Sequence, residues 1–397
     1  MKKFIIIIFF FIAIIILFFL ILKKKVGDIQ PAVLPPKNSQ MSPTNTVSSP
    51  KIGHEPNIPL HLPSGFTIGV FASNLSDARA LTFTPDGSAL LVSLTSKGKI
   101  VAISDTHQTG TADKVKVLLT GLNNPHGLAF YQGYLYLAEE TQLSRFSWDP
   151  QNWQLTNQKI LFSLPKGGRH FTRSIVFDKS GRLFVTIGST CDVCIELNPW
   201  YAAIIVTDKD GNNPKVFAQG LRNSVFMTQN PQTNEIWATE MGRDWLGDET
   251  PPDEINIVKQ GGDYGWPYCY GNRIYDKNFG QNSPSYCQNT IAPIYQIPAH
   301  SAPLGLTFIN SSQFPSDWQG DLLVAYHGSW NRSTPTGYKV VHLKIKDNQI
   351  INAEDFISGF LEGDQALARP VDLIFDQEGS LYISDDKGGF IFKVVKN

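Results

Sequence analysis

The sequence predicts an all-β protein, a six-bladed β-propeller preceded by an N-terminal transmembrane helix and a flexible linker. Three observations predict the propeller. A strand–turn–strand pattern recurs six times between residues 81 and 386. Segments with the helical period are scarce between the repeats. Each repeat is too small to bury its own apolar faces, and closure into a ring is the common way an all-β repeat protein does so.

Each repeat is predicted to be a β-hairpin, because two runs of alternating apolar residues flank a polar turn that usually contains Gly. In chain order the six hairpins are residues 81–94, 128–140, 175–188, 227–242, 306–328 and 373–386. Wider spacing among the later repeats predicts insertions near residues 190–200 and 243–300.

The chain begins with a segment of different composition. Phe4–Leu22 is an uninterrupted run of 19 apolar residues, which as a helix would be about 28 Å long, close to the hydrocarbon thickness of a bilayer. No small-residue cleavage site follows, so residues 1–25 are predicted to be an uncleaved signal anchor. Residues 26–63 are rich in Pro, Ser, Thr and Asn, which predicts a flexible linker. The propeller is then expected to span residues 64–397.

The cysteines indicate the compartment. Lysines flank the apolar run on both sides and nearly cancel the charge bias that orients a membrane helix. All four cysteines lie in the propeller domain, as the close pairs Cys191/Cys194 and Cys269/Cys287, which is typical of disulfides in an oxidising compartment. A metal or redox C-x-x-C site is the competing interpretation. We expect a single-pass protein of the cell membrane whose globular domain lies outside the cytoplasm.

The overall charge argues against one class of partner. The chain has 34 Lys and Arg against 35 Asp and Glu, a net charge of −1. It therefore lacks the excess of basic residues that is typical of nucleic-acid-binding proteins.

The repeats predict a site at one end of the ring. In a propeller blade the inner strand lines the axis, and its start lies at the same end as the end of its antiparallel partner. Residues just before the inner strands should therefore meet at one mouth of the axis, and every repeat has a polar or cationic residue there. These are Arg79, His126, His170 with Arg173, Arg222 with Asn223, His300, and Arg369. The partner strands bring residues 188–192, 240–245, 327–332 and 384–389 to the same mouth.

A mouth that carries histidines and arginines predicts an anionic ligand, because guanidinium groups suit paired hydrogen bonds to carboxylates. His170 is the candidate base. Arg169 and Arg173 flank it and would raise the local positive potential. We expect this potential to keep the imidazole neutral near pH 7, so that it can accept a proton.

Six segments carry a resemblance to a known family: "GGRHFTRSIVF", "FAQGLRNSVFM", "DEINIVKQGGDYGWPYCYG", "AHSAPLGLTF", "HGSWNRSTPTGYKVV" and "ARPVDLIFDQEGSLYISDD". In these segments the chain resembles the pyrroloquinoline-quinone-dependent glucose/sorbosone dehydrogenases, most closely the aldose sugar and L-sorbosone dehydrogenase branch. The resemblance covers roughly residues 64–395. That family forms six-bladed propellers, in agreement with the repeat count.

The resemblance implies roles for individual residues. His170 matches the base that takes the proton of a sugar hydroxyl while hydride moves from that carbon to the quinone. The resemblance implies cofactor contacts for Arg222, Asn223, Arg369 and Arg332. Arg173 is added to them because of its place at the predicted mouth. Calcium in this family is coordinated partly by backbone carbonyls of a loop that here contains Gly242 and Arg243. A hard cation there would polarise the quinone carbonyl that receives the hydride.

The chain departs from the family pattern at two places. Ser189 and Thr190 stand where the glucose-oxidising branch has an aspartate that orients the histidine, and Met241 replaces a glutamine. Glucose specificity is therefore not supported, and the substrate is expected to be a sugar or sugar aldehyde. Candidate substrate contacts are His300, Trp330 and Asp192. The sequence does not specify the electron acceptor.

Two alternatives come from other functional classes. One is a calcium-dependent propeller hydrolase of the lactonase kind, because a fold by itself does not decide function. The other is a propeller that binds sugar or protein without catalysis. A lactonase needs mainly acidic and amide ligands around its metal, whereas a tricarboxylate cofactor needs several cations. The predicted mouth offers Arg173, Arg222 and Arg369, which favours the dehydrogenase.

Overall fold

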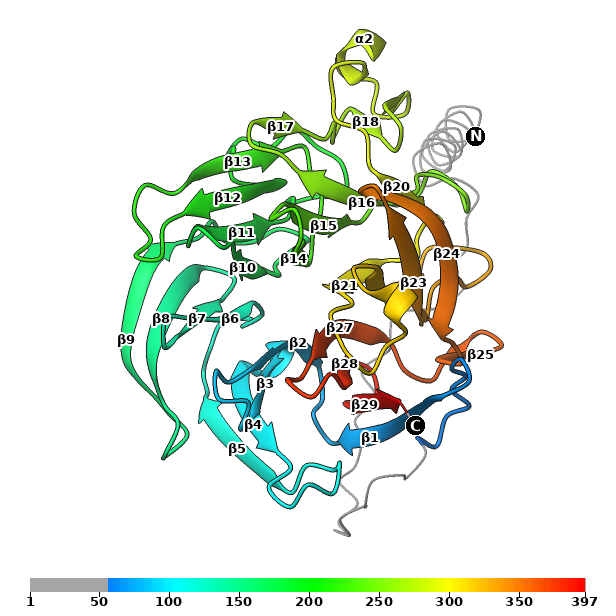
Figure 1. Ribbon diagram of the computed structural model, residues 1–397. Coiled ribbons are helices and arrows are strands. Elements are labelled where there is room, and N and C mark those ends of the chain that lie inside the picture. Colours follow the sequence, from blue (N-terminus) through cyan, green and yellow to red (C-terminus); the bar gives the residue numbers. More distant parts are fainter. Residues whose placement is uncertain (1–55, 397) are drawn as a thin grey trace, which may run out of the picture.

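The computed structural model describes residues 56–396, which form six antiparallel sheets arranged in a ring around a central axis (Figure 1). We number the blades by their inner strands in chain order. Blade 1 contains β2 (Ala78–Phe83), β3 (Leu90–Leu94), β4 (Lys99–Ser104) and β5 (Lys114–Leu119). Blade 2 contains β6 (Leu128–Tyr131), β7 (Tyr134–Ala138), β8 (Gln142–Asp149) and β9 (Gln154–Ser163). Blade 3 contains β10 (Ile175–Phe177), β11 (Leu183–Ile187), β12 (Ala203–Thr207) and β13 (Lys215–Gln219), with β17 (Gly262–Asp263) added in parallel.

The other three blades complete the ring. Blade 4 contains β14 (Met227–Gln229), β15 (Ile236–Glu240), β16 (Asp253–Val258) and β20 (Tyr295–Ile297). Blade 5 contains β21 (Pro303–Phe308), β22 (Leu322–Tyr326), β23 (Lys339–Lys346) and β24 (Gln349–Ile357). Blade 6 contains β27 (Pro370–Phe375), β28 (Leu381–Asp385), β29 (Ile391–Lys396) and β1 (Phe66–Ala72). Minor elements are β18 (Cys269–Tyr270), β19 (Ile274–Tyr275), β25 (Leu361–Glu362), β26 (Gln365–Ala366), the short helix α2 (Pro284–Cys287), and the 3-10 turns Thr95–Lys97 and Ser316–Trp318.

The six predicted hairpins are the two innermost strands of the six blades. Their first strands, β2, β6, β10, β14, β21 and β27, contact one another in sequence around the axis, and β27 returns to β2. The prediction of a six-bladed propeller is therefore confirmed.

The ring is closed by pairing the two ends of the described chain. β1 pairs antiparallel with β29, from Phe66 opposite Lys396 to Ala72 opposite Ile391. Blade 6 thus takes three strands from the C-terminal end of the chain and its outer strand from the N-terminal end.

The hydrophobic core of the described residues is divided among the seams between blades. Six clusters of buried side chains lie between successive blades. In the seam between blades 4 and 5, for example, Trp237 is fully buried and packs edge-on against Phe308, with ring centroids 5.3 Å apart. Each blade therefore buries one face against each neighbour, which is why a single blade would not be stable alone.

Both predicted insertions are present. One is the loop between β11 and β12, and the other comprises the loop between β15 and β16 and the long excursion between β16 and β20. The excursion carries β18 and α2, which project from the rim of the ring (Figure 1). The disulfide Cys269–Cys287 fastens it.

The predicted membrane helix lies outside the described residues, as does the linker up to residue 55. The part of the predicted linker that is described, residues 56–63, packs on the propeller. Ile58, Leu60 and Leu62 lie against the cluster between blades 5 and 6, and His61 forms a β-bridge with Ser358. Within residues 56–396, no helix has the length and apolar character needed to cross a membrane.

Candidate functional site

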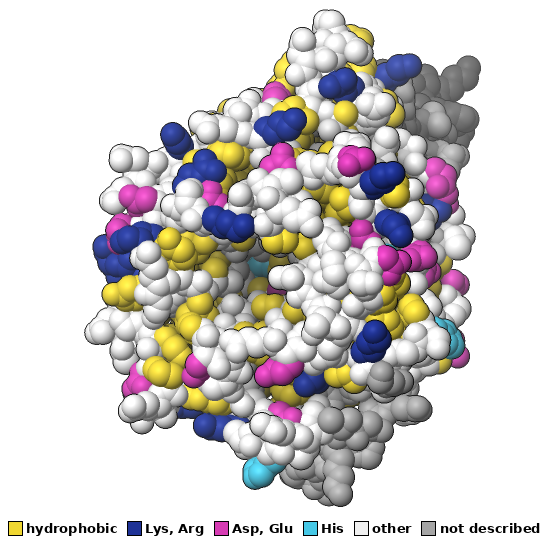
Figure 2. Space-filling model, in the orientation of Figure 1, with side chains coloured by type: hydrophobic (Ala, Val, Ile, Leu, Met, Phe, Trp, Pro, Cys, Tyr) yellow, Lys and Arg dark blue, Asp and Glu magenta, His cyan; other side chains and the backbone are white. Residues whose placement is uncertain are grey.

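The starts of the inner strands and the ends of their partners meet at one end of the ring, as the repeats predict. A cavity of about 200 Å³ opens there between blades 3, 4 and 5. Its walls are Arg169, His170, Arg222, Asn223, Met241, Gly242, Asp244, Asp253, His300, Ala302, Trp330 and Asn331. We call this cavity the axial pocket. In the orientation of Figure 1, the molecular surface is hollowed near the axis (Figure 2).

His170 lies in the pocket wall and is held through one ring nitrogen. Its Nδ1 lies 3.0 Å from the carbonyl oxygen of Ser189 and 2.9 Å from the Ser189 hydroxyl oxygen. Burial, and then the positive charges of Arg222, Arg169 and Arg173, hold the pKa of His170 well below its usual range. The imidazole is therefore neutral at pH 7, as expected from the sequence. Arg222 lowers the pKa of His170 more than Arg169 or Arg173 does.

Arg222 is buried at the centre of a hydrogen-bond network. Its Nε donates to the carbonyl oxygen of Asp192 at 2.9 Å, and its Nη2 donates to the Asp192 carboxylate at 2.8 Å and to Asp244 at 3.3 Å. The next residue, Asn223, donates its backbone N–H to the carboxyl group of Glu240 at 2.8 Å. The turn before β14 is thus fixed on both sides, and the guanidinium and amide groups stay at the pocket wall.

Two buried carboxyl groups of the wall, Asp244 and Asp253, were not singled out as site residues from the sequence. Asp244 accepts hydrogen bonds from Arg169, Arg222 and Asn331. Asp253 accepts the backbone N–H groups of Gly242 and Ala302, and burial raises its pKa to about 7. Both belong to the acidic segment 243–254. Exposed loops often have the same composition, so the sequence did not reveal that these two carboxyl groups are buried.

The pocket wall also presents a second imidazole and an indole. His300 Nε2 lies 2.8 Å from the carbonyl oxygen of Gly247, and the Trp330 ring lies 5.7 Å from the guanidinium of Arg169 and 5.1 Å from the ring of Trp245. The two predicted substrate contacts His300 and Trp330 are therefore brought into the axial pocket.

Other predicted site residues are not brought to the pocket wall, and the prediction for Arg173 is wrong. Arg173 is fully buried and donates to the carbonyl oxygens of His170, Thr172 and Pro165. It is buried away from the cavity, and its Nη1 and Nη2 are bonded to the backbone carbonyls of its own loop, while its buried Nε has no hydrogen-bond partner. It acts on the site from behind, by holding the carbonyl oxygen of His170 and as a nearby positive charge.

Asp192 and Arg332 lie behind the pocket. Asp192 accepts hydrogen bonds from Arg222 and from the backbone N–H of Asp244, so it contacts cavity residues rather than the cavity. Arg332 donates to the carbonyl oxygens of Asp248 and Ala299 and pairs with Glu249. Both predicted contacts are corrected to positions in which they hold neighbouring loops.

Arg369 belongs to a second polar cluster beside the axis. It donates to the carbonyl oxygens of His327 and Gly328, which shortly precede Trp330 in the chain. His327 and Arg79 both pair with Asp386. Burial, then the charge of Arg369, lowers the pKa of His327 to about 4. These residues come from blades 1, 5 and 6, so cationic groups continue around the mouth from the axial pocket.

The calcium loop predicted from the resemblance also borders the pocket. Gly242 lies in the wall, and its N–H is held by Asp253 at 2.9 Å. The side chain of Arg243 turns away to Asp276, with Nη1 2.7 Å from the carboxylate. Of these two residues, Gly242 lines the axial pocket, whereas Arg243 lies next to it in the chain and outside the wall.

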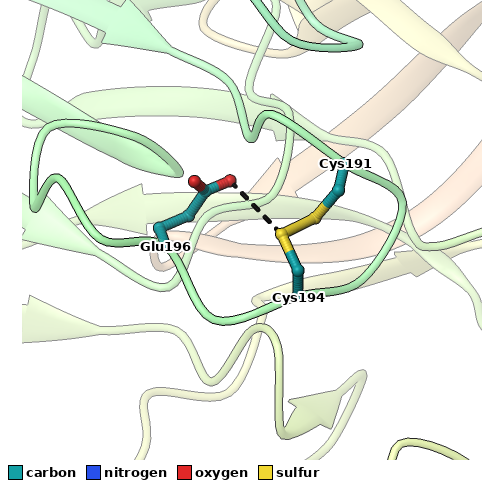
Figure 3. Close-up of side chains that lie close together, drawn as sticks. All are labelled: Cys191, Cys194 and Glu196. Carbon is teal, nitrogen blue, oxygen red and sulfur yellow. Dashed lines mark hydrogen bonds between the residues drawn. A yellow bond between two sulfur atoms is a disulfide. The ribbon is translucent and has the colours of Figure 1, made fainter.

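Both cysteine pairs are disulfides, so the metal interpretation of C-x-x-C is wrong for this structure. Cys191, Cys194 and Glu196 have the spacing of a metal site, but both sulfurs are bonded to each other (Figure 3). A disulfide sulfur is not a thiolate ligand.

Comparisons with known proteins relate the chain to one described family and to several solved structures. A family described as TrAA12-like matches residues 60–397. An uncharacterized protein of Borreliella burgdorferi is 33% identical over 84% of this chain and 90% of its own length. A pyrroloquinoline-quinone-dependent pyranose dehydrogenase of Coprinopsis cinerea is 25% identical over 86% of this chain, which spans 55% of that enzyme. A calcium structure of a Trichoderma reesei family AA12 enzyme superposes with a TM-score of 0.76 at 20% identity, covering 89% of this chain and 99% of that one. The family resemblance seen in the sequence is confirmed.

Proposed function

The chain belongs to the TrAA12-like family, and on that premise we propose that it is a pyrroloquinoline-quinone- and calcium-dependent sugar dehydrogenase. The observation that carries the proposal is the axial pocket, in which a neutral histidine lies beside a buried arginine and asparagine. The dehydrogenases named among its relatives give the reaction class.

His170 is proposed as the general base. With Nδ1 engaged by Ser189, Nε2 is the nitrogen left to take the proton of a substrate hydroxyl. The lowered pKa keeps this nitrogen unprotonated at neutral pH. After proton transfer the imidazolium would still donate from Nδ1 to Ser189, so the ring need not turn.

The cofactor is proposed to lie against Arg222 and Asn223, with the cationic cluster of Arg79 and Arg369 farther along the mouth. The fit rests on position and charge, because Arg222 and Asn223 line the cavity, whereas Arg173 does not. The Arg222 guanidinium is held by Asp192, Asp244 and the Met241 carbonyl oxygen, and it would act on an anion with several carboxylates mainly through its charge. When bound, the quinone would accept hydride from the sugar carbon, with calcium polarising the receiving carbonyl. Gly242 and Arg243 are proposed to supply backbone oxygens to calcium, because Asp253 fixes the Gly242 peptide.

The substrate is proposed to enter between His300 and Trp330. An aromatic face and an imidazole suit the apolar face and the hydroxyl groups of a sugar ring.

The hydrolase alternative is less favoured by the same pocket. Its acidic ligands would be Asp244 and Asp253, yet every oxygen of these two carboxyl groups already accepts a hydrogen bond from the protein. The same walls also carry the cations Arg169 and Arg222, whereas a metal site of the lactonase kind needs mainly acidic and amide ligands.

We further propose that residues 1–25 anchor the protein in the cell membrane with the propeller on the extracytoplasmic side. Two disulfides in the propeller support an oxidising compartment. The run Phe4–Leu22 supports the anchor.

The test uses the chain without residues 1–55, loaded with pyrroloquinoline quinone and calcium, and follows dye reduction over a panel of aldoses and sugar aldehydes. We expect activity that needs both additions. His170→Gln should bind the quinone and lose about 10²-fold or more in kcat, the contribution typical of a positioned base. If His170→Gln bound less quinone but kept an unchanged kcat in the molecules that hold it, the role of His170 as base would be contradicted. No quinone binding by the unmodified chain would overturn the proposal.

A further inference from the structure

We propose that the loop closed by the Cys191–Cys194 disulfide is a positioning device, and that Ser189 at its start fixes the tautomer of His170. This inference rests on the proposed function, because it concerns the residue proposed as its base. It assigns a role to a disulfide that lies beside the axial pocket and that the reaction itself does not use.

The donors and acceptors around Ser189 determine the tautomer. The Ser189 hydroxyl donates to the carbonyl oxygen of Cys191 at 2.6 Å. A hydroxyl has one hydrogen, so toward His170 the same oxygen can only accept. The second atom near His170 Nδ1 is the Ser189 carbonyl oxygen at 3.0 Å, which is also an acceptor only. Both contacts therefore require the hydrogen on Nδ1 and leave the lone pair on Nε2.

That tautomer suits a base in this pocket. Within residues 56–396, His170 Nε2 makes no hydrogen bond to the protein, and the side chain lines the cavity. The opposite tautomer would present an N–H to the substrate hydroxyl and could not take its proton. Choice of tautomer therefore sets the fraction of molecules that can react.

The loop itself is held at three points. The disulfide joins Cys191 to Cys194, and the carboxyl group of Glu196 turns toward them, 3.8 Å from Cys194 Sγ (Figure 3). Glu196 also accepts the backbone N–H of Thr190 at 2.6 Å and its hydroxyl at 3.0 Å. The carbonyl oxygen of Thr190 in turn accepts the backbone N–H of Arg169 at 2.9 Å. Ser189 and the segment that carries His170 are thereby locked together.

The same loop positions a second pocket residue. Asp192, inside the disulfide ring, accepts two hydrogen bonds from Arg222 through its carbonyl and carboxylate oxygens. The backbone N–H of Ser189 donates to the carbonyl oxygen of Arg222 at 2.7 Å. Loosening the loop should therefore disturb His170 and Arg222 together.

The first test reads the tautomer directly, in the full-length chain without cofactor, by NMR of ¹⁵N-labelled histidine, with His170→Gln to assign the signals. We expect a protonated Nδ1 and an unprotonated Nε2 for His170. In Cys191→Ser/Cys194→Ser we expect a mixture of tautomers, whereas Cys269→Ser/Cys287→Ser, which removes the other disulfide, should leave the His170 signals unchanged. An unprotonated Nδ1 in the unmodified chain, or an unchanged signal in Cys191→Ser/Cys194→Ser, would overturn the inference.

The second test uses the holoenzyme and the milder variant Ser189→Ala. It leaves the carbonyl acceptor in place, so we expect kcat to fall about threefold to tenfold, a small part of what a general base contributes, with KM changed less than about twofold. The matched control is Ser93→Ala, which removes another fully buried serine hydroxyl, bonded to the backbone N–H of Ala80. Equal kinetics for the Ser189→Ala enzyme and the unmodified enzyme would count against Ser189. Because the NMR result needs no activity, failure of the sugar oxidation itself remains distinguishable from failure of this inference.

Discussion

Arg169 lines the axial pocket and also tunes it electrostatically. Its guanidinium pairs with Asp244 and lies over Trp330, and its charge is one of the causes that lower the pKa of His170. Because the effect is Coulombic, it should depend on charge rather than on shape.

The prediction for Arg169 concerns the pH profile. Removing the cation in Arg169→Ala should raise the pKa of His170, so that the base becomes protonated at a higher pH. The acid limb of kcat/KM should therefore move to higher pH, and Arg169→Lys, which keeps the charge, should move it less. Measurement of kcat/KM between pH 4 and 8 checks this, and equal shifts in the two variants would contradict the electrostatic account.

Glu240 has its carboxyl group beneath the turn that carries Arg222 and Asn223. It is buried, accepts the backbone N–H of Asn223 and contacts the hydroxyl of Ser224 at 2.5 Å. Burial raises its pKa to about 8 from an ordinary 4.5. Between those two values the folded chain keeps a proton that the unfolded chain has lost. Its contribution to stability is therefore complete below pH 4.5 and is lost as the pH rises through 8.

Glu240→Gln should keep the acceptor for Asn223 and remove the ionisation. Between pH 6.5 and 8, the free energy of unfolding of the unmodified chain should fall as Glu240 ionises. We expect the fall in the Glu240→Gln variant to be smaller by about 2 kcal/mol. Urea unfolding at both pH values, with the exposed Glu362→Gln as control, measures the difference. A control that changes the slope equally would show that Glu240 is not the cause.

At the scale of elements, the loop between β15 and β16 is held by side chains of other segments. Arg332, which follows β22, donates to the carbonyl oxygen of Asp248 and pairs with the exposed Glu249, and His300, which precedes β21, contacts Gly247. The hydroxyl and backbone N–H of Ser333 bind the Asp248 carboxylate. Blade 5 therefore fastens the loop that contains the proposed calcium carbonyls.

Arg332→Ala should release this loop. A hydrogen bond to a charged group contributes about 1.5–3 kcal/mol, so we expect amide exchange in residues 243–250 to become about tenfold faster or more, and calcium affinity to fall. Arg332→Lys should keep part of the protection. Hydrogen exchange read by mass spectrometry, together with a calcium titration, tests this, and unchanged exchange in the alanine variant would contradict the clamp.

At the scale of the whole molecule, the ring depends on one pairing between distant ends of the chain. β1 supplies Phe66, Ile68 and Val70 to the cluster between blades 5 and 6, and without it β29 would be an open edge. The described chain between β1 and β29 forms the ring that this one pairing closes.

Deletion of residues 1–72 should open the ring. The buried side chains of Ile68 and Phe71, worth about 1.5–3 kcal/mol each, leave the core. The same deletion removes the partly buried side chains of Ile58, Leu60, Leu62, Phe66 and Val70. The total loss is comparable with the stability of a typical domain. We expect a much lower Tm and a broader transition by calorimetry, whereas deletion of residues 1–55, which keeps every described residue, should unfold in the same way as the full chain. Equal transitions for the two deletions would show that closure by β1 is dispensable.

The sequence alone determined the hairpins, their number and the end of the ring at which His170, Arg222 and His300 lie. The reason is that strand alternation and turn residues act locally, and antiparallel pairing then places each strand start at a known end. Only the tertiary structure decided which side chains face the axial pocket. Arg173 and Arg369 stand at the predicted positions, yet they turn to backbone carbonyls, while Asp253 and Asp244 enter the wall from an acidic run. These directions depend on hydrogen-bond partners in other blades, tens of residues away, and no local pattern in the chain encodes them.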